Sequence, residues 1–246
     1  MTMKKVNLTI ISASLLTLVL FFMILYSKGF ERILNSMFST KFPSGSRIPL
    51  HELFLQHLEM VAISSLIAIV AGLVLGIFVT TRYGGEFKEP LLKLVNFGQT
   101  FPSAALLALV IPIVGYGIEG ALIALTIYSL MPIVYNVVTG IEEVPKDVLE
   151  AAKGMGMTER ETYVKVKIPL ALNAILGGIR TAVVINISAA TLAATAGAGG
   201  LGVLVVNGVK TFDMILILEG SIPVTLFAII VELVLKDMQK RVVFTR

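Results

Sequence analysis

Six apolar runs, each long enough to cross a lipid bilayer as a helix, set the first constraint on this chain. A helix needs about 20 mainly apolar residues to cross the hydrocarbon core, and inside lipid only helices and closed barrels satisfy every backbone hydrogen-bonding group. Only 15% of the residues are charged, against about a quarter in soluble domains. The sequence therefore predicts an all-α polytopic membrane protein with six transmembrane helices. The expected spans cover residues 8–26, 57–81, 91–114, 118–138, 170–195 and 214–235.

The first run follows a short basic N-terminus and resembles the apolar region of a signal peptide. No clear small-x-small cleavage pattern follows it, so a retained transmembrane helix is the better interpretation. We expect residues 1–56 to form this helix and an outer linker, which is polar over 27–56. Residues 57–246 then form the main transmembrane domain.

Residues that usually hold metals are scarce. The chain has two histidines and no cysteine, which excludes disulfides and thiolate metal sites. His51 and Glu52 begin the H-E of a zinc-protease motif, but Leu55 stands where that motif needs a histidine. His51 and His57 are therefore expected in the linker or at the membrane interface, and we predict no metal site and no cofactor.

The basic residues favour one orientation in the membrane. With a cytoplasmic N-terminus and six spans, the segments 82–93 and 145–169 and the C-terminal tail lie inside, and they carry most of the 20 Lys and Arg residues. Such an excess marks cytoplasmic loops. We therefore predict a multi-pass protein of the cytoplasmic membrane with both termini in the cytoplasm, and we expect no nucleic-acid partner.

A polar stretch between two spans covers residues 145–169 and has the pattern of a helix-turn-helix. Pro145 suits a first helical position, and Gly154 or Gly156 can end this helix at a positive φ. Thr158 and Glu161 stand three residues apart, as in a capping box that starts a second helix. Small alanines on the first helix let another surface approach closely; an ordinary solvated loop is the alternative. The candidate docking residues are Asp147, Glu150, Ala151, Ala152, Gly154, Gly156 and Pro169.

The spacing within this stretch resembles a known motif. Glu150-Ala151-Ala152 is followed after three residues by Gly156, and after nine more by Val166-x-Ile168-Pro169. This pattern is similar to the EAA loop of binding-protein-dependent ABC transporter permeases, E-A-A, three residues, Gly, nine residues, I-x-L-P, with conservative apolar replacements. The resemblance implies the permease of a type I ABC importer whose first loop helix couples to an ATPase. It also implies three partners: a cytoplasmic ATP-binding subunit, an extracellular substrate-binding protein and a second permease subunit.

Candidate residues of a translocation path lie within the apolar runs. Pro102 interrupts the third span and frees a backbone carbonyl, which suits a path that opens, although a packing kink explains it nearly as well. The run from Gly197 to Gly202 matches G-x-G-x-x-G, but that fingerprint binds dinucleotides only between a strand and a helix. Here the run follows a span, so we expect it at the outer end of the path, with a flexible turn as the alternative. The candidate path residues are Gln99, Phe101, Pro102, Arg180, Gly197, Gly199, Gly200 and Gly202.

Arg180 lies roughly 16 Å along a helix that starts near Pro169. A charge at that depth is costly and normally faces a partner or a cavity, so pairing or function is favoured over snorkelling to the interface. Glu142, Glu143 and a second subunit are the candidate partners, whereas Glu219 is expected at the membrane interface.

The cargo is suggested by a second resemblance. The Q-T-x-P-S segment at 99–103, the glycine run and G-S-I-P at 220–223 look like permeases for glycine betaine, carnitine and choline, over residues 57–240. This implies import of a quaternary-amine compatible solute. The alternatives are the same architecture importing methionine or a sulfonate, and an ATPase-independent channel. The chain has no G-x-x-x-x-G-K-[ST] motif, so a non-catalytic subunit is expected, with ATP hydrolysis on the partner.

Overall fold

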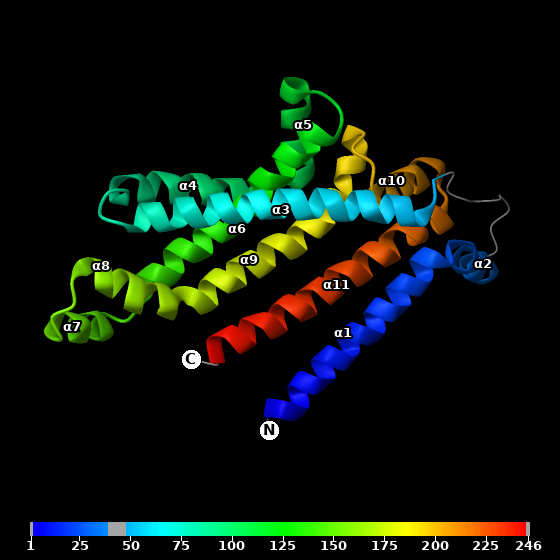
Figure 1. The fold of residues 1–246 in the computed structure, drawn as a ribbon. Coiled ribbons are helices and arrows are strands. Elements are labelled where there is room, and N and C mark those ends of the chain that lie inside the picture. The colour runs from blue at the N-terminus through cyan, green and yellow to red at the C-terminus, as the bar shows by residue number, and fades with distance from the viewer. Residues whose placement is uncertain (1, 39–47, 245–246) are drawn as a thin grey trace.

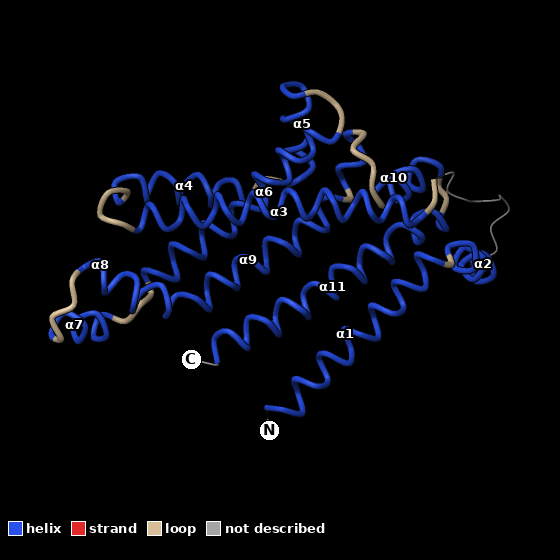
Figure 2. Tube along the Cα trace, viewed as in Figure 1, coloured by secondary structure: helices blue, strands red, loops and turns tan. Residues whose placement is uncertain are grey.

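The computed structural model describes residues 2–38 and 48–244, and the regular structure in these ranges is entirely helical (Figures 1 and 2). The α-helices are α1 (Thr2–Leu25), α2 (Ser27–Phe38), α3 (Leu50–Thr80), α4 (Gly85–Thr100), α5 (Ser103–Val114), α6 (Ile118–Glu142), α7 (Lys146–Gly154), α8 (Glu159–Thr162), α9 (Ile168–Ala190), α10 (Gly202–Thr211) and α11 (Met214–Phe244). A π-helix, η1 (Tyr163–Lys167), joins α8 to α9, and a 3-10 helix, η2 (Leu192–Ala196), follows α9.

The spans agree with the sequence pattern. Among the described residues, four helical segments are long and apolar enough to cross a membrane alone, and two bent pairs, α1 with α2 and α4 with α5, raise the number to six when each pair counts as one span. The four segments are Leu50–Thr80, Ile118–Glu142, Glu159–Ala190 and Met214–Val243. The prediction of an all-α protein with six spans is confirmed in this form.

Helix α6 lies at the centre of the bundle, between α3 and α9. Helix α11 packs against α9 and α10, and α1 lies along α11 (Figure 1). We call the end of the bundle that carries α7 and α8 the loop end, and the opposite end, which carries α2 and α10, the far end. The N-terminus of α1 and the C-terminus of α11 both point toward the loop end (Figure 1).

Two glycines bring α3 into close contact with α6. A Cβ atom added at Gly72 would lie 2.7 Å from Ile133 Cγ2, and one added at Gly76 would lie 2.7 Å from Val137 Cβ. Separations this short leave no room for a side chain. The G-x-x-x-G spacing therefore serves close helix packing, as small residues commonly do between membrane helices.

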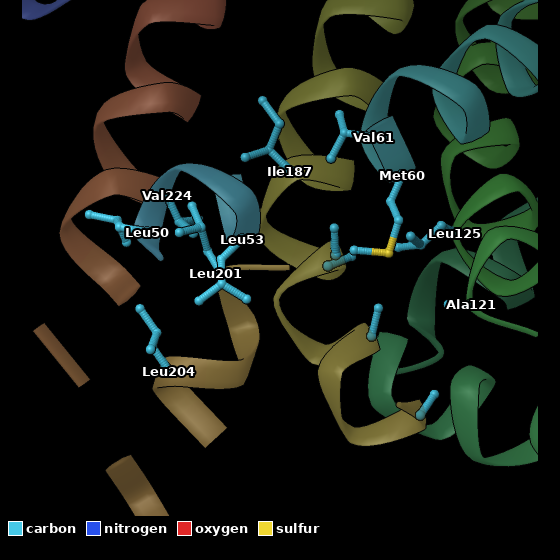
Figure 3. Packing of buried hydrophobic residues seen from close by; sticks show 14 of the residues in the cluster. Leu50, Leu53, Met60, Val61, Ala121, Leu125, Ile187, Leu201, Leu204 and Val224 are labelled. Atoms are coloured by element: carbon cyan, nitrogen blue, oxygen red, sulfur yellow. The ribbon is translucent and has the colours of Figure 1, made fainter. Parts of the chain in front are cut away.

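The largest apolar cluster joins the far-end parts of several helices. Leu50, Leu53 and Met60 of α3 pack beside Leu201 and Leu204, and Leu125 of α6 and Ile187 of α9 close the same cluster (Figure 3). Leu53 and Leu201 are completely buried. This cluster fixes the connection between α9 and α10 against the start of α3.

We expected a polar linker over 27–56, but much of its described length is helical. Residues 27–38 form α2, because Phe30 and Leu34 share one helix face and are buried. Helix α3 begins at Leu50, earlier than expected, because Leu50 and Leu53 are buried in the apolar cluster. Residues 39–47 of the expected linker lie outside the described residues.

We predict that Gly76→Leu destabilises the protein, since its side chain would collide with Val137. Overpacking of this kind costs about 1–3 kcal/mol. The matched control is Gly85→Leu at the first residue of α4, where an added Cβ meets nothing within 4 Å. Thermal unfolding of the purified protein, followed by helical circular dichroism, should show a lower midpoint for Gly76→Leu alone. Equal midpoints for the two variants would contradict the proposed contact.

Candidate functional site

The polar stretch 145–169 folds as the helix-turn-helix that its sequence predicts. Helix α7 begins directly after Pro145 and ends at Gly154. Gly156 then adopts a φ of 78°, in the left-handed region that favours glycine, and its N–H donates to the Lys153 carbonyl. Of the two glycines considered for ending the first helix, Gly156 is the one with the positive φ.

Helix α8 begins with the predicted capping box. The Glu161 N–H donates to Thr158 Oγ1 at 3.3 Å, and the Thr158 N–H donates to Glu161 Oε2 at 3.1 Å. Glu161 also pairs with Lys165 one turn later, at 2.9 Å. These bonds satisfy backbone donors that a helix start leaves open, so they define the turn between α7 and α8.

One face of α7 presents apolar and small side chains away from the rest of the chain. Val148 and Ala151 of α7 and Met155, which caps its end, are exposed and follow one another at spacings of three and four residues, so they lie on one face. Ala152, directly beside Ala151, is 1% exposed and packs inward. The polar residues Asp147 and Glu150 are also exposed. An exposed apolar stripe on a short amphipathic helix fits the groove of a partner protein.

The loop is bound to the transmembrane helices at Tyr163. This residue begins the π-helix η1, which runs directly into α9, close to Pro169. Its hydroxyl donates to the Ile77 carbonyl at 3.2 Å and lies 2.6 Å from Thr80 Oγ1, both near the end of α3. Short π-helical segments occur often at functional sites. The sequence analysis missed this contact, because a single tyrosine after a capping box carries no signal of its partner.

The break around Pro102 separates α4 from α5 by a bend of 106°. Gln99 is exposed in the last turn of α4, the Phe101 N–H donates to the Gly98 carbonyl, and Pro102 caps the start of α5. The expected interruption of the third span is therefore present. Its second proline, Pro112, stays within α5 without ending it.

The glycine run is a packed connection at the far end of the bundle. Gly197, Gly199 and Gly200 have φ values of 75°, 84° and 76°. The Gly200 N–H donates to Gln56 Oε1 at 3.0 Å. A Cβ added at Gly202 would lie 1.9 Å from the Thr191 carbonyl oxygen. The glycine run therefore contacts α3 and the residue directly after α9, and these contacts favour a packed connection over the flexible turn that was the alternative. The described residues contain no strand, so the dinucleotide-binding context is absent there.

Arg180 pairs with α11, and neither Glu142 nor Glu143 is its partner. Its Nε lies 3.4 Å from Glu232 Oε2, and its Nη1 donates to Gln239 Oε1 at 3.0 Å. Glu142, at the end of α6, pairs with Lys88 of α4 instead. Of the candidate partners, Glu142 and Glu143 were wrong, because the sequence does not show which helix lies beside Arg180.

The bonds between α9 and α11 continue toward the loop end. Gln239 Nε2 donates to both the carbonyl and the Oδ1 of Asn173, each at 2.9 Å. Arg180, Glu232, Gln239 and Asn173 thus form a polar ladder between the two helices. Inside a membrane such interhelical bonds join helices that apolar contacts alone align weakly.

Several polar groups are buried inside the bundle, which we did not expect from the sequence. His57 was expected in the linker or at the interface, but it is fully buried, with Nε2 3.1 Å from the Ile187 carbonyl oxygen. Glu219 was expected at the interface and is 3% exposed. Asn186, which the sequence analysis did not single out, donates to Ser64 and Ser65 of α3 at 2.7 and 2.8 Å. Each of these polar residues stands within an apolar run. Such a position indicates that the side chain is buried but does not indicate its hydrogen-bonding partner.

The candidate residues do not form one compact site. The candidate docking residues lie at the loop end, the glycine run packs at the far end, and Arg180 belongs to the ladder between α9 and α11. Within the described residues, no group of three or more His, Asp or Glu side chains is arranged to hold a metal ion.

These features define a helical membrane protein with a polar helix-turn-helix loop at one end of its bundle. Residues 72–243 match the model of the binding-protein-dependent transport system inner membrane component family. The chain belongs to this family, and the resemblance inferred from the E-A-A spacing is confirmed.

Two relatives and one solved structure agree with the assignment. The chain is 40% identical to the glycine betaine/carnitine/choline transport system permease protein OpuCB of Bacillus subtilis, over 76% of this chain and 85% of that protein. It is 38% identical to the ergothioneine transport permease/ergothioneine binding protein EgtU of Helicobacter pylori, over 70% of this chain and 31% of that protein. A chain of the MetNI methionine ABC transporter in an inward-facing conformation superposes with a TM-score of 0.66, covering 76% of this chain and 93% of that chain. At 22% identity, it supports the fold alone.

We predict that Arg180 and Glu232 are energetically coupled. Arg180→Met or Glu232→Gln alone leaves the opposite partner uncompensated at membrane depth, so the double variant should be more stable than the sum of the single losses implies. Contacting residues show interaction energies of about 0.5–3 kcal/mol.

A double-mutant cycle on thermal stability measures this coupling. The control pair is Glu89 with Lys93, 3.8 Å apart and mostly exposed, where surface screening leaves little interaction. Additive effects at Arg180 and Glu232, equal to those of the control pair, would contradict the coupling.

Proposed function

We propose that this chain is the permease subunit of an ATP-driven importer that carries a quaternary-amine compatible solute, such as glycine betaine, carnitine or choline, into the cell. The observation that carries the proposal is the exposed stripe of Val148 and Ala151 on α7 and Met155 at its C-terminal cap. It lies on the loop with E-A-A spacing, in a chain of the binding-protein-dependent family. A channel without an ATPase would have no use for this docking face.

In this proposal, α7 docks in a groove of a cytoplasmic ATP-binding subunit. The apolar stripe enters the groove, while Asp147 and Glu150 lie at its rim and Gly154 and Gly156 allow close approach. Ala152 lies on the buried side of α7 and packs this helix against its own subunit. ATP hydrolysis takes place on the partner, and this chain remains non-catalytic.

Movement of α7 reaches the spans by three routes. The first is covalent, because α8, η1 and α9 follow one another without a gap and pass through Pro169. The second is the hydrogen bond from Tyr163 to the end of α3. The third is the ladder from Arg180 to α11. When ATP binding draws the ATPase subunits together, these links turn the helices between outward-facing and inward-facing states.

The orientation and the remaining partners follow from the same proposal. The loop end and both termini face the cytoplasm, because the polar segments there carry most of the basic residues. A second permease subunit completes the path, and an extracellular substrate-binding protein delivers cargo to the far end. Residues 57–246 form the permease domain, with residues 1–56 as an addition to it.

We also propose that the candidate path residues border the translocation path. The bend at Gln99, Phe101 and Pro102 makes the backbone irregular at the junction of α4 and α5, and irregular backbone at membrane depth is tolerated where it lines a path or packs in protein. The glycine run, Gly197, Gly199, Gly200 and Gly202, would border the outer mouth, and Arg180 would position α9.

The cargo class rests on the relatives. The OpuCB relative is named for glycine betaine, carnitine and choline, and the EgtU relative for ergothioneine. All four compounds carry a trimethylammonium group. The methionine transporter supports the fold but not the cargo, so methionine and sulfonates are the second candidates.

ATP-dependent uptake tests the function. Proteoliposomes would hold this chain with its ATPase and binding protein, and uptake of radiolabelled glycine betaine would be measured. We expect uptake only with ATP, and loss of uptake in Ala151→Arg, because a charge in an apolar groove is costly. The matched control is Lys153→Gln, also exposed on α7 but away from the stripe, which should keep uptake.

Two outcomes would contradict parts of this proposal. Uptake that ignores both ATP and Ala151→Arg would favour a channel over an importer. ATP-dependent uptake of methionine but not of glycine betaine would keep the mechanism and overturn the cargo.

A further inference from the structure

Helix α2 lies outside the residues that match the family and leaves α1 at a sharp angle. The family match begins at residue 72, whereas α2 covers Ser27–Phe38. Its axis makes an angle of 95° with that of the preceding helix. Helix α2 contacts α11 at the far end of the bundle (Figure 1).

This angle puts α2 in the plane of the membrane surface. Helix α1 has 24 residues and is therefore about 36 Å long at 1.5 Å per residue, more than the roughly 30 Å of the hydrocarbon core. It also lies along α11, which is long enough to cross by itself. Since α1 lies along α11, a helix that is long enough to cross the membrane alone, a helix almost perpendicular to α1 runs parallel to the membrane surface.

The apolar face of α2 is wider than its contact with the protein. Phe30 and Leu34 are buried and belong to the far-end apolar cluster. Ile33 and Met37 continue the same apolar face, yet they are 55% and 69% exposed. The bundle thus covers one side of this face and leaves the other side open at the level of the membrane surface.

Phe38, the last residue of α2, is exposed as well, and the other exposed residues of α2 are polar and partly basic. Lys28 and Arg32 stand four residues apart, and Ser36 continues their line along the helix, so the three share one face. A helix with apolar residues on one side and Lys and Arg on the other lies in the interface, with its apolar side among the acyl chains. The basic face complements the negatively charged phosphates of lipid headgroups.

We propose that α2 is an interfacial helix that binds the phospholipid surface at the far end of the bundle. Ile33 and Met37 enter the acyl region, and Lys28 and Arg32 lie at the level of the headgroups. The helix thereby fixes the depth of the adjoining ends of α1 and α11 in the bilayer. Binding of α2 to lipid requires neither a particular cargo nor ATP coupling, so a failure of the transport experiments would not contradict it.

Tryptophan fluorescence tests this proposal cleanly, because the chain contains no tryptophan. The full chain would carry Met37→Trp or, as the matched control, Ser36→Trp, and would be reconstituted in phospholipid vesicles with brominated acyl chains. Both positions are exposed, so neither substitution disturbs the core. We expect bromine to quench Met37→Trp several-fold more strongly than Ser36→Trp, and aqueous iodide to quench mainly Ser36→Trp.

Ile33→Trp provides a second variant on the apolar side and should behave like Met37→Trp. Equal iodide access at positions 33, 36 and 37 would overturn the proposal. Protection of Met37→Trp that develops only when an extracellular binding protein is added would also overturn it, because the surface would then belong to a protein partner.

Discussion

Close approach of backbones on both sides of α6 is the contact on which the rest of the bundle depends. In lipid, burial of apolar side chains drives helix association only weakly, so small residues that allow tight packing become decisive. Gly72 and Gly76 admit α6 from the side of α3. On the other side, a Cβ added at Gly140 would lie 2.6 Å from Ala174, and one at Gly178 would lie 2.6 Å from Asn136. Helices α3, α6 and α9 therefore form one tightly packed unit.

This unit explains why a short loop could control a whole bundle. The loop helices are continuous with α9 and hydrogen-bonded to α3 through Tyr163. Helix α11 joins them through Arg180 and Glu232. A displacement of α7 would then act on tightly packed helices. Tightly packed interiors transmit strain instead of absorbing it. The exposed stripe on α7 is the point where an external protein would supply that displacement.

Local signals in the sequence were sufficient for the spans and for the loop. The apolar runs predicted the membrane helices, Thr158 and Glu161 predicted the capping box, and Pro102 predicted the break in the third span. The E-A-A spacing was sufficient for the family. The partner of Arg180 and the burial of His57 could not be predicted, because each depends on which helix lies opposite. The polar residues within 27–38 indicated a linker, because an amphipathic helix of only 12 residues carries too few apolar positions to stand out from a polar stretch.

The most direct test of the account is a cross-link between α7 and the ATP-binding subunit in the assembled transporter. The chain has no cysteine, so Ala151→Cys and Ala152→Cys each provide a single thiol for a photoactivatable cross-linker. Ala151 is exposed, whereas its neighbour Ala152 is buried. The account predicts that position 151 cross-links to the ATP-binding subunit and that position 152 does not. An active transporter in which position 151 fails to cross-link, or in which both positions cross-link equally, would contradict the docking of α7.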